Sequence, residues 1–239
     1  MLTIAHSELL QVLRNRAVLI NSFIVPVAAS AFFIYFRDLF ERIGSLGYIG
    51  AVIVFTIAAF NLYATTVTTL TGRRQTVFLK RLRSTAASDP GILLGLMLPI
   101  VVISLLQVCL ILMALAGVSG QPANIAVLTV AIVATFLMML ALGMATAGVT
   151  NSPENAQVTS LPISLGVVVV ANWVAISGTE SLTLLKRLLP GGAAAELVVD
   201  SWNGGLGLGD SLLLLVPTLG WVVVAIAVAT RLFRWEPRQ

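Results

Sequence analysis

No charged residue occurs between Asp89 and Glu154, and this long apolar stretch limits the folds open to the chain more than any other feature. The rest of the sequence follows the same trend, because 58% of the 239 residues are hydrophobic, only 10% are charged, and the mean hydropathy is +1.01. Soluble domains carry about 25% charged residues. A water-soluble fold of this size has too little interior for so much apolar surface, so the sequence predicts a protein that folds in lipid.

A helix that crosses a bilayer needs about 20 mostly apolar residues. Charge-free windows of this kind cover residues 17–36, 47–70, 91–117, 124–149, 158–178 and 211–230. The turn-forming sequence GVSGQPAN at 117–124 separates the third window from the fourth. We therefore predict an all-α polytopic membrane protein with six transmembrane helices in a single domain, residues 1–239, and with both termini on the same side of the membrane.

The positions of Lys and Arg predict which side holds the termini. In the six-span arrangement, the side of the termini carries Arg14, Arg16, Arg73, Arg74, Lys80, Arg81, Arg83, Arg231, Arg234 and Arg238. The opposite side carries Arg37, Arg42, Lys186 and Arg187. Because Lys and Arg concentrate in cytoplasmic loops, both termini are predicted to be cytoplasmic. The same distribution accounts for the basic pI near 9.8 without a nucleic-acid partner.

Two segments outside the windows have patterns of their own. Residues 2–16 mix leucines with polar and basic side chains, which is typical of a short helix lying along the membrane surface. On the outer side, residues 182–189 and 193–202 are two apolar pieces separated by the sequence Pro-Gly-Gly. Each piece is too short to cross a bilayer, so we predict a pair of interfacial or re-entrant helices before the last span.

The cytoplasmic segment 71–89, with the sequence TGRRQTVFLKRLRSTAASD, is the most distinctive part of the chain. We call it the basic segment. Its apolar and basic residues alternate in a way that predicts a short basic amphipathic helix. In one interpretation its arginines only set the topology and contact lipid headgroups. In the other, Phe78, Leu79 and Leu82 face a cytoplasmic partner, and the segment is a docking surface.

The chain lacks the residues that ATP-binding, catalytic and metal-binding motifs require. The chain has no G-x-x-x-x-G-K-[ST] loop for ATP, and His6 and Cys109 are its only histidine and cysteine. We therefore predict no catalytic residue, no metal site and no cofactor held by this chain. The six windows contain no Asp, Glu, His, Lys or Arg, whereas proton-driven carriers place such groups inside the bilayer. The energy for any uphill transport is thus expected to come from a partner protein.

Polar side chains in the second window, at Asn61, Thr65 and Thr68, recur at i, i+4 and i+7 and therefore share one helix face. With Asn172 of the fifth window, they are candidates for the lining of a substrate path. The alternative is that they join helices or bond to carbonyls of their own helix. Small residues at four-residue spacing, which permit close helix packing, occur in the fourth and sixth windows: Gly143 and Ala147, and Ala225 and Ala229.

Residues 73–99, RRQTVFLKRLRSTAASDPGILLGLMLP, resemble the type-two permeases of ATP-binding-cassette exporters, also called ABC-2 or type V. Members of that family tend to carry L-[KR]-[RK]-L-x-[ST]-[TS]-P, and residues 79–85 match it, with Ala86 in place of the proline. The order of surface helix, spans, basic segment and broken outer hairpin extends the resemblance over nearly the whole chain. Residues 232–238 are similar to the ends of small drug-efflux permeases from high-GC Gram-positive bacteria.

The resemblance implies a permease subunit in a bacterial cell membrane, which exports an amphipathic drug, antibiotic, peptide or lipid and so contributes to multidrug efflux or antibiotic resistance. A separate ATPase subunit would bind ATP and Mg and dock on the basic segment through Arg73, Arg74, Phe78, Leu79, Arg81 and Leu82. A second permease chain, identical or a sister, would pair with this one around a path lined by Asn61, Thr65, Thr68 and Asn172. The alternatives are a non-transporting membrane scaffold or immunity protein, and an energy-independent channel.

Overall fold

The computed structural model describes residues 25–43, 45–76, 78–84, 88–204 and 207–233. Over these ranges the chain consists of helices and short connections, without a strand. The predicted surface helix 2–16 and residues 17–24 of the first predicted span lie outside the described residues. The rest of that span is α3 (Val25–Tyr35), and α4 (Arg37–Ile43) follows it directly.

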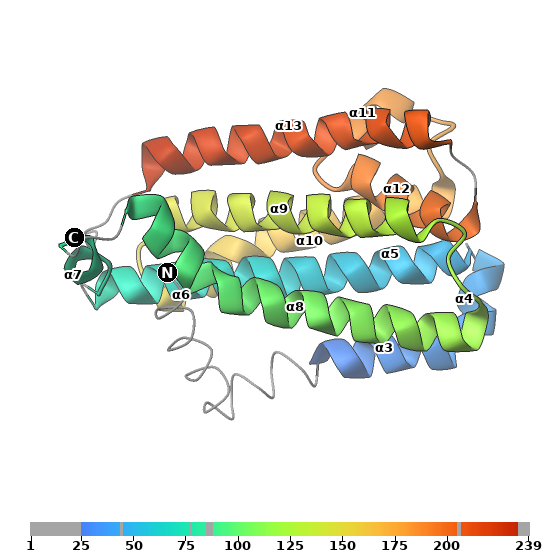
Figure 1. Ribbon diagram of the computed structural model, residues 1–239, viewed down its shortest axis with the longest axis horizontal. Coiled ribbons are helices and arrows are strands. Elements are labelled where there is room, and N and C mark those ends of the chain that lie inside the picture. Colours follow the sequence, from blue (N-terminus) through green and yellow to red (C-terminus); the bar gives the residue numbers. More distant parts are fainter. Residues whose placement is uncertain (1–24, 44, 77, 85–87, 205–206, 234–239) are drawn as a thin grey trace.

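Five helices of the described part are long and apolar enough to cross a bilayer. They are the composite helix Leu46–Gln75, α8 (Asp89–Ser119), α9 (Ile125–Val149), α10 (Pro153–Ser177), and residues Gly209–Leu232 of α13 (Leu208–Leu232). All five run along the long axis of the molecule (Figure 1). Each overlaps one of the predicted windows from the second to the sixth. The predicted all-α polytopic membrane fold is therefore confirmed.

The composite helix has three parts, which are α5 (Leu46–Thr56), a π-helical stretch η2 (Ile57–Tyr63), and α6 (Ala64–Gln75). Ser45 begins it as an N-cap, because its hydroxyl accepts a hydrogen bond from the Tyr48 N–H at 3.2 Å. The helix continues five residues past the predicted end of the second window. This extension is stable because it places Arg73 and Arg74 in the last turn, at the negative end of the helix dipole.

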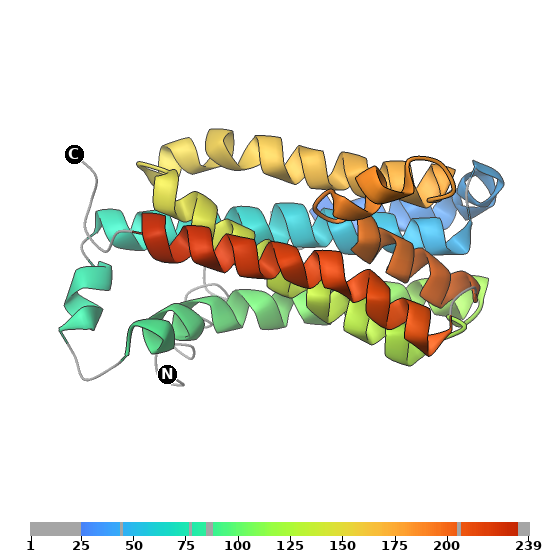
Figure 2. The same ribbon diagram turned by 90° about the horizontal axis from the view of Figure 1, so that it is seen from above.

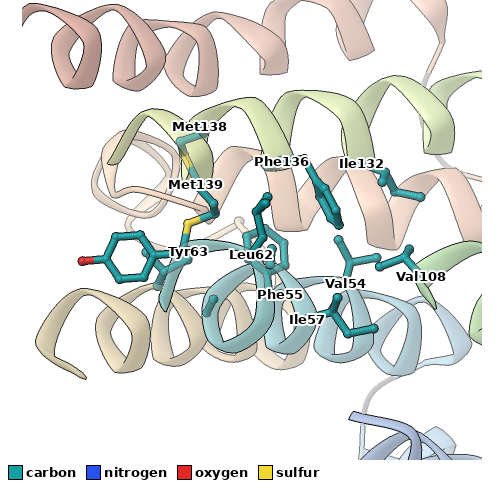
Figure 3. Packing of buried hydrophobic residues seen from close by; sticks show 14 of the residues in the cluster. Val54, Phe55, Ile57, Leu62, Tyr63, Val108, Ile132, Phe136, Met138 and Met139 are labelled. Atoms are coloured by element: carbon teal, nitrogen blue, oxygen red, sulfur yellow. The ribbon is translucent and has the colours of Figure 1, made fainter. Parts of the chain in front are cut away.

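The composite helix forms the centre of the bundle. In its most apolar window 83% of the residues are buried, whereas the corresponding value for α13 is 22%. Phe55 and Leu62 of this helix lie in one apolar cluster with Val108 of α8 and Phe136 of α9 (Figure 3). Its first part, α5, is apolar on all sides, as expected of a helix in the interior. α8, α9 and α10 pack against the composite helix, and α13 packs on α9 (Figures 1 and 2).

The small residues of α9 and α13 allow these helices to pack closely against other helices of the same chain. A Cβ atom on Gly143 of α9 would lie 2.9 Å from Thr66 Cγ2 and 3.3 Å from the Tyr63 carbonyl oxygen. Ala225 and Ala229 of α13 are buried, and α13 packs on α9. These faces are therefore occupied by neighbouring helices of the same chain.

The segment predicted on the outer side, which we call the outer hairpin, forms two short helices, α11 (Thr183–Leu188) and α12 (Gly192–Asn203), at the positions expected from the sequence. At the turn between them, a Cβ atom on Gly192 would lie 1.7 Å from the Lys186 carbonyl oxygen, so only glycine fits. α12 packs against α5, α9, α10 and α13. Its last turn accepts backbone hydrogen bonds from Ala123 and Asn124, at 3.2 and 2.9 Å, which ties the hairpin to the start of α9.

Candidate coupling segment and polar path

The described residues of the basic segment lie at one end of the bundle, and α11 and α12 lie at the other (Figure 1). Residues 71–75 complete α6, the short helix α7 (Phe78–Arg83) follows, and α8 begins at Asp89. Seen from above, α7 extends beyond the ends of the long helices (Figure 2). The short helix expected in this segment is therefore present, although the segment's first residues belong to the preceding span.

α7 turns part of its apolar face toward its own bundle. Leu79 is buried, and Phe78 and Leu82 are half-buried against the apolar core. The Arg73 guanidinium lies 4.9 Å from the centre of the Phe78 ring, which is a cation–π contact between α6 and α7. Arg81 is exposed. Leu79 therefore fixes α7 to the bundle, and the surface that α7 presents outward includes Arg81 and the outer parts of Phe78 and Leu82.

An ion pair connects α7 to the start of α8. Arg83 Nε donates to Asp89 Oδ1 at 3.2 Å, and Arg83 Nη2 lies 3.2 Å from Asp89 Oδ2. Both side chains are well exposed, so the pair contributes little to the free energy of unfolding. Its effect is to restrain how the chain enters α8.

Arg74, one of the predicted coupling residues, is buried. Its Nη1 donates to the Ala147 carbonyl oxygen at 3.0 Å, and its Nη2 donates to the Thr150 carbonyl oxygen. Both acceptors belong to the end of α9. In the sequence Arg74 is indistinguishable from its neighbour Arg73, and only the position of α9 separates their roles. Arg74 therefore joins two helices of this chain, and its guanidinium is covered from solvent.

Asn61, the first residue of the predicted polar path, is buried in the middle of the composite helix. Its side-chain amide donates to Gln107 Oε1 at 2.9 Å, and Gln107 is also buried. The hydrogen bond joins η2 to α8. In this chain Asn61 therefore has the helix-joining contact that was the alternative to a path-lining role.

The other three path candidates lie on different surfaces. Asn172 accepts a hydrogen bond from the Tyr48 hydroxyl at 3.2 Å and donates to the Val168 carbonyl oxygen at 2.8 Å, so it joins α10 to α5. Thr65 is half-buried, and Thr68 is exposed and donates to the Ala64 carbonyl oxygen at 2.9 Å. The stripe thus runs from the interior at Asn61 to the surface at Thr68, and Asn172 belongs to a separate contact.

The outer hairpin contains a charged network that the sequence analysis did not identify. Arg187 donates from Nε and Nη2 to the two Glu196 carboxylate oxygens, at 2.8 and 2.7 Å. Thr179 also donates to Glu196, at 2.6 Å. Lys186 is buried and donates to the Ser177 hydroxyl at 2.8 Å and to the Gly178 carbonyl oxygen at 2.7 Å. These bonds fix α11 to α12 and to the end of α10.

Asp200 lies one turn after Glu196 on α12 and is half-buried. Burial, together with the nearby Glu196 carboxylate, raises the pKa of Asp200 to about 6, although Arg187 acts in the opposite direction. Asp200 borders a cleft of about 330 Å³ with Asn124 and Ser211. Among the described residues, no group of three or more His, Cys, Asp or Glu side chains has an arrangement that could hold a metal ion.

The family model for the ABC-2 type transporter matches residues 1–173, which include the basic segment and the helices up to most of α10. The chain belongs to the ABC-2 type transporter family. A comparison with the curated proteins finds no match. As an ABC-2 protein, this permease is a multi-pass membrane protein and the transmembrane component of an ABC transporter, and its family implies an ATP-binding cassette subunit as partner. The resemblance inferred from residues 73–99 is therefore confirmed for the family, whereas the likeness to proteins of high-GC Gram-positive bacteria stays a prediction.

Proposed function

We propose that this permease exports an amphipathic small molecule from the cytoplasm, driven by ATP hydrolysis in a separate ATPase subunit that docks on α7. The observation that carries the proposal is the position of α7. It is a short basic helix at the end of the bundle, fixed by the buried Leu79 and presenting Arg81 outward. A helix fixed in this way passes a displacement on to the bundle, whereas a loose loop would absorb it.

The source of energy in this proposal is the partner. ATP and Mg would be bound by the ATPase subunit, because this chain has no phosphate-binding loop. The predicted apolar windows contain no Asp, Glu, His, Lys or Arg for a proton relay. Apolar spans of this kind suit a drug, antibiotic, peptide or lipid better than a bare ion.

The cargo route is proposed to form between this permease and a second chain, either an identical copy or a sister. Thr68 is exposed and Thr65 half-buried on the surface of α6, so a second chain is needed to enclose them. Asn61 and Asn172 lie deeper and bond to neighbouring helices. A cargo that reaches those two amides would have to replace their present partners.

Docking is tested with a charge reversal at the exposed position of α7. The variant Arg81→Glu keeps Leu79 in place, so the fold is expected to persist while a contact with an acidic or polar ATPase surface is lost. The permease is purified from its host in mild detergent, and co-purifying proteins are identified. Arg42→Glu is the matched control, because Arg42 is an exposed arginine at the opposite end of the bundle.

The proposal expects a P-loop ATPase with the wild type and with Arg42→Glu, and much less of it with Arg81→Glu. Reconstitution of both subunits in vesicles should then give ATP-dependent movement of an amphipathic dye. Binding of the ATPase without any movement of dye would favour the non-transporting scaffold. Dye flux in vesicles that lack the ATPase would favour the energy-independent channel.

A further inference from the structure

Arg74 is a charged side chain that the fold has enclosed at the cytoplasmic end of α6. Only 1% of its surface is exposed. A buried guanidinium without partners is strongly destabilising, so its position is possible only because carbonyl oxygens accept its hydrogen bonds. Two of its acceptors are the carbonyl oxygens of Ala147 and Thr150.

Both acceptors are groups that α9 cannot satisfy by itself. The last turn of a helix has carbonyl oxygens without an N–H donor four residues ahead, and it is also the negative end of the helix dipole. α9 ends at Val149, with Thr150 as its C-cap residue. Arg74 therefore supplies from α6 the hydrogen bonds and the positive charge that cap α9.

The backbone around this contact lies against two further helices, α10 and α13. A Cβ atom on Gly72 of α6 would lie 3.9 Å from Pro153 Cβ at the start of α10. A Cβ atom on Gly148 of α9 would lie 3.1 Å from the backbone of Leu232 and Phe233, at the end of α13. Arg74 thus joins the end of α6 to the end of α9, the same turn of α6 lies beside the beginning of α10, and the end of α9 packs on the end of α13.

We infer that Arg74 is a positioning residue, which makes the end of α6 and the α9–α10 turn move as one body when α7 is displaced. The inference rests on the proposed function, because the displacement is assigned to the ATPase subunit. By contrast, α7 is joined to α8 by the exposed Arg83–Asp89 pair, which is a weaker restraint. Movement of α7 is therefore passed to the ends of α9, α10 and α13 through Arg74, whereas the exposed pair restrains the start of α8 less tightly.

The first test measures the joint itself and requires no ATPase. Cys109 is replaced by Ala, and spin labels are attached at Gln75→Cys and Asn155→Cys, two exposed positions on either side of the contact. The distance distribution between the labels should be narrow in this background. Adding Arg74→Gln, which removes the positive charge and leaves one terminal NH2 group instead of two, should broaden the distance distribution. An unchanged distribution in the Arg74→Gln variant would overturn the inference.

The second test separates transmission from folding. In the assembled complex, Arg74→Gln should keep ATPase co-purification and ATP hydrolysis but reduce ATP-driven transport about tenfold. Arg74→Lys, which keeps a cation near the carbonyl oxygens, should recover part of the transport. Arg73→Gln is the control, because Arg73 stacks on Phe78 of α7. Its loss should reduce ATPase co-purification rather than the transport obtained for each ATP that is hydrolysed.

Transport by Arg74→Gln at the wild-type rate would also overturn the inference. If Arg74→Gln does not fold, Arg74→Lys takes its place in both experiments, and a narrow distance distribution with normal transport contradicts the proposed role. If the wild type itself binds no ATPase, the proposed function fails, whereas the distance measurement still decides whether Arg74 joins the helices.

Discussion

Amide side chains inside an apolar bundle are destabilising unless they are paired, and this permease pairs three of them across helices. Asn61 donates to Gln107, and Asn172 accepts from the Tyr48 hydroxyl. The spacing of polar residues predicted a shared face on the second span, but it contains no information on the neighbour that each amide meets. The choice between a path and a helix contact therefore depends on the packing of α8 and α10.

The Asn61–Gln107 contact can be measured with a double-mutant cycle. Asn61→Leu leaves the buried Gln107 amide without this partner, and we expect the free energy of unfolding to fall by about 1 kcal/mol. The double variant, Asn61→Leu with Gln107→Leu, should lose less free energy of unfolding than the sum of the two single effects. In it both amides are replaced, so no buried amide is left without its partner. Unfolding in detergent measures the four proteins.

Additive single effects would mean that the Asn61–Gln107 hydrogen bond contributes nothing to stability. Transport by the same variants addresses the alternative role. A path-lining Asn61 predicts an altered preference among cargo dyes in Asn61→Leu that the second substitution does not restore, whereas a helix-joining Asn61 predicts that transport follows stability.

The individual roles of the arginines were the least predictable from the sequence. Arg73, Arg74 and Arg81 lie in one basic run, and the positive-inside pattern applies to all three equally. In the structure Arg74 caps α9, Arg73 stacks on Phe78 and Arg81 is exposed. The difference follows from the rotation of about 100° between successive residues of a helix, and from which neighbouring helix lies on each side.

The long helices were predictable because lipid demands about 20 apolar residues in a row, and charge interrupts such a run clearly. The windows located the second to sixth spans, and the length of the two outer pieces located α11 and α12. Helix ends were less predictable, since the helix of the second window continues to Gln75. The π-helical stretch η2 was not predicted. A π-helix changes the number of residues per turn, and this change cannot be detected where nearly every residue is apolar and no periodicity is visible.

The outer hairpin should respond to pH through Asp200. Its pKa in the folded protein is raised from 3.8 to about 6, so between these values the folded state holds the proton more tightly than the unfolded state. Raising the pH through this interval therefore lowers the free energy of unfolding. The wild type, measured against Asp200→Asn, should be most stable near pH 4, lose stability up to about pH 6, and change little above it.

Thermal unfolding in detergent over this pH range checks the prediction, with Asp210→Asn as a control. Asp210 is an exposed carboxylate at the start of α13. A stability difference between wild type and Asp200→Asn that does not vary from pH 4 to pH 6 would contradict the assigned environment. A difference that varies in the opposite sense would place Asp200 in an ion pair with Arg187.

Burial within the single chain is uneven, and this bears on how the permease assembles. The composite helix is mostly enclosed, yet Phe60 and Thr68 remain exposed along one side of it. α13 is also widely exposed, but its outward residues are almost all aliphatic, as expected of a helix that faces lipid. The proposed second chain is therefore expected beside α6, with α13 facing the bilayer.

Cysteine cross-linking tests this arrangement in membranes. In a Cys109→Ala background, Thr68→Cys should form a covalent dimer on mild oxidation, because a two-fold axis beside α6 brings the two copies of this position together. Val223→Cys, at an exposed position of α13, should stay monomeric under the same conditions. Cross-linking at Val223 and none at Thr68 would place the partner on α13 instead. No cross-link at either position in the homogeneous protein, with one at Thr68 on co-expression of a sister permease, would identify a heterodimer.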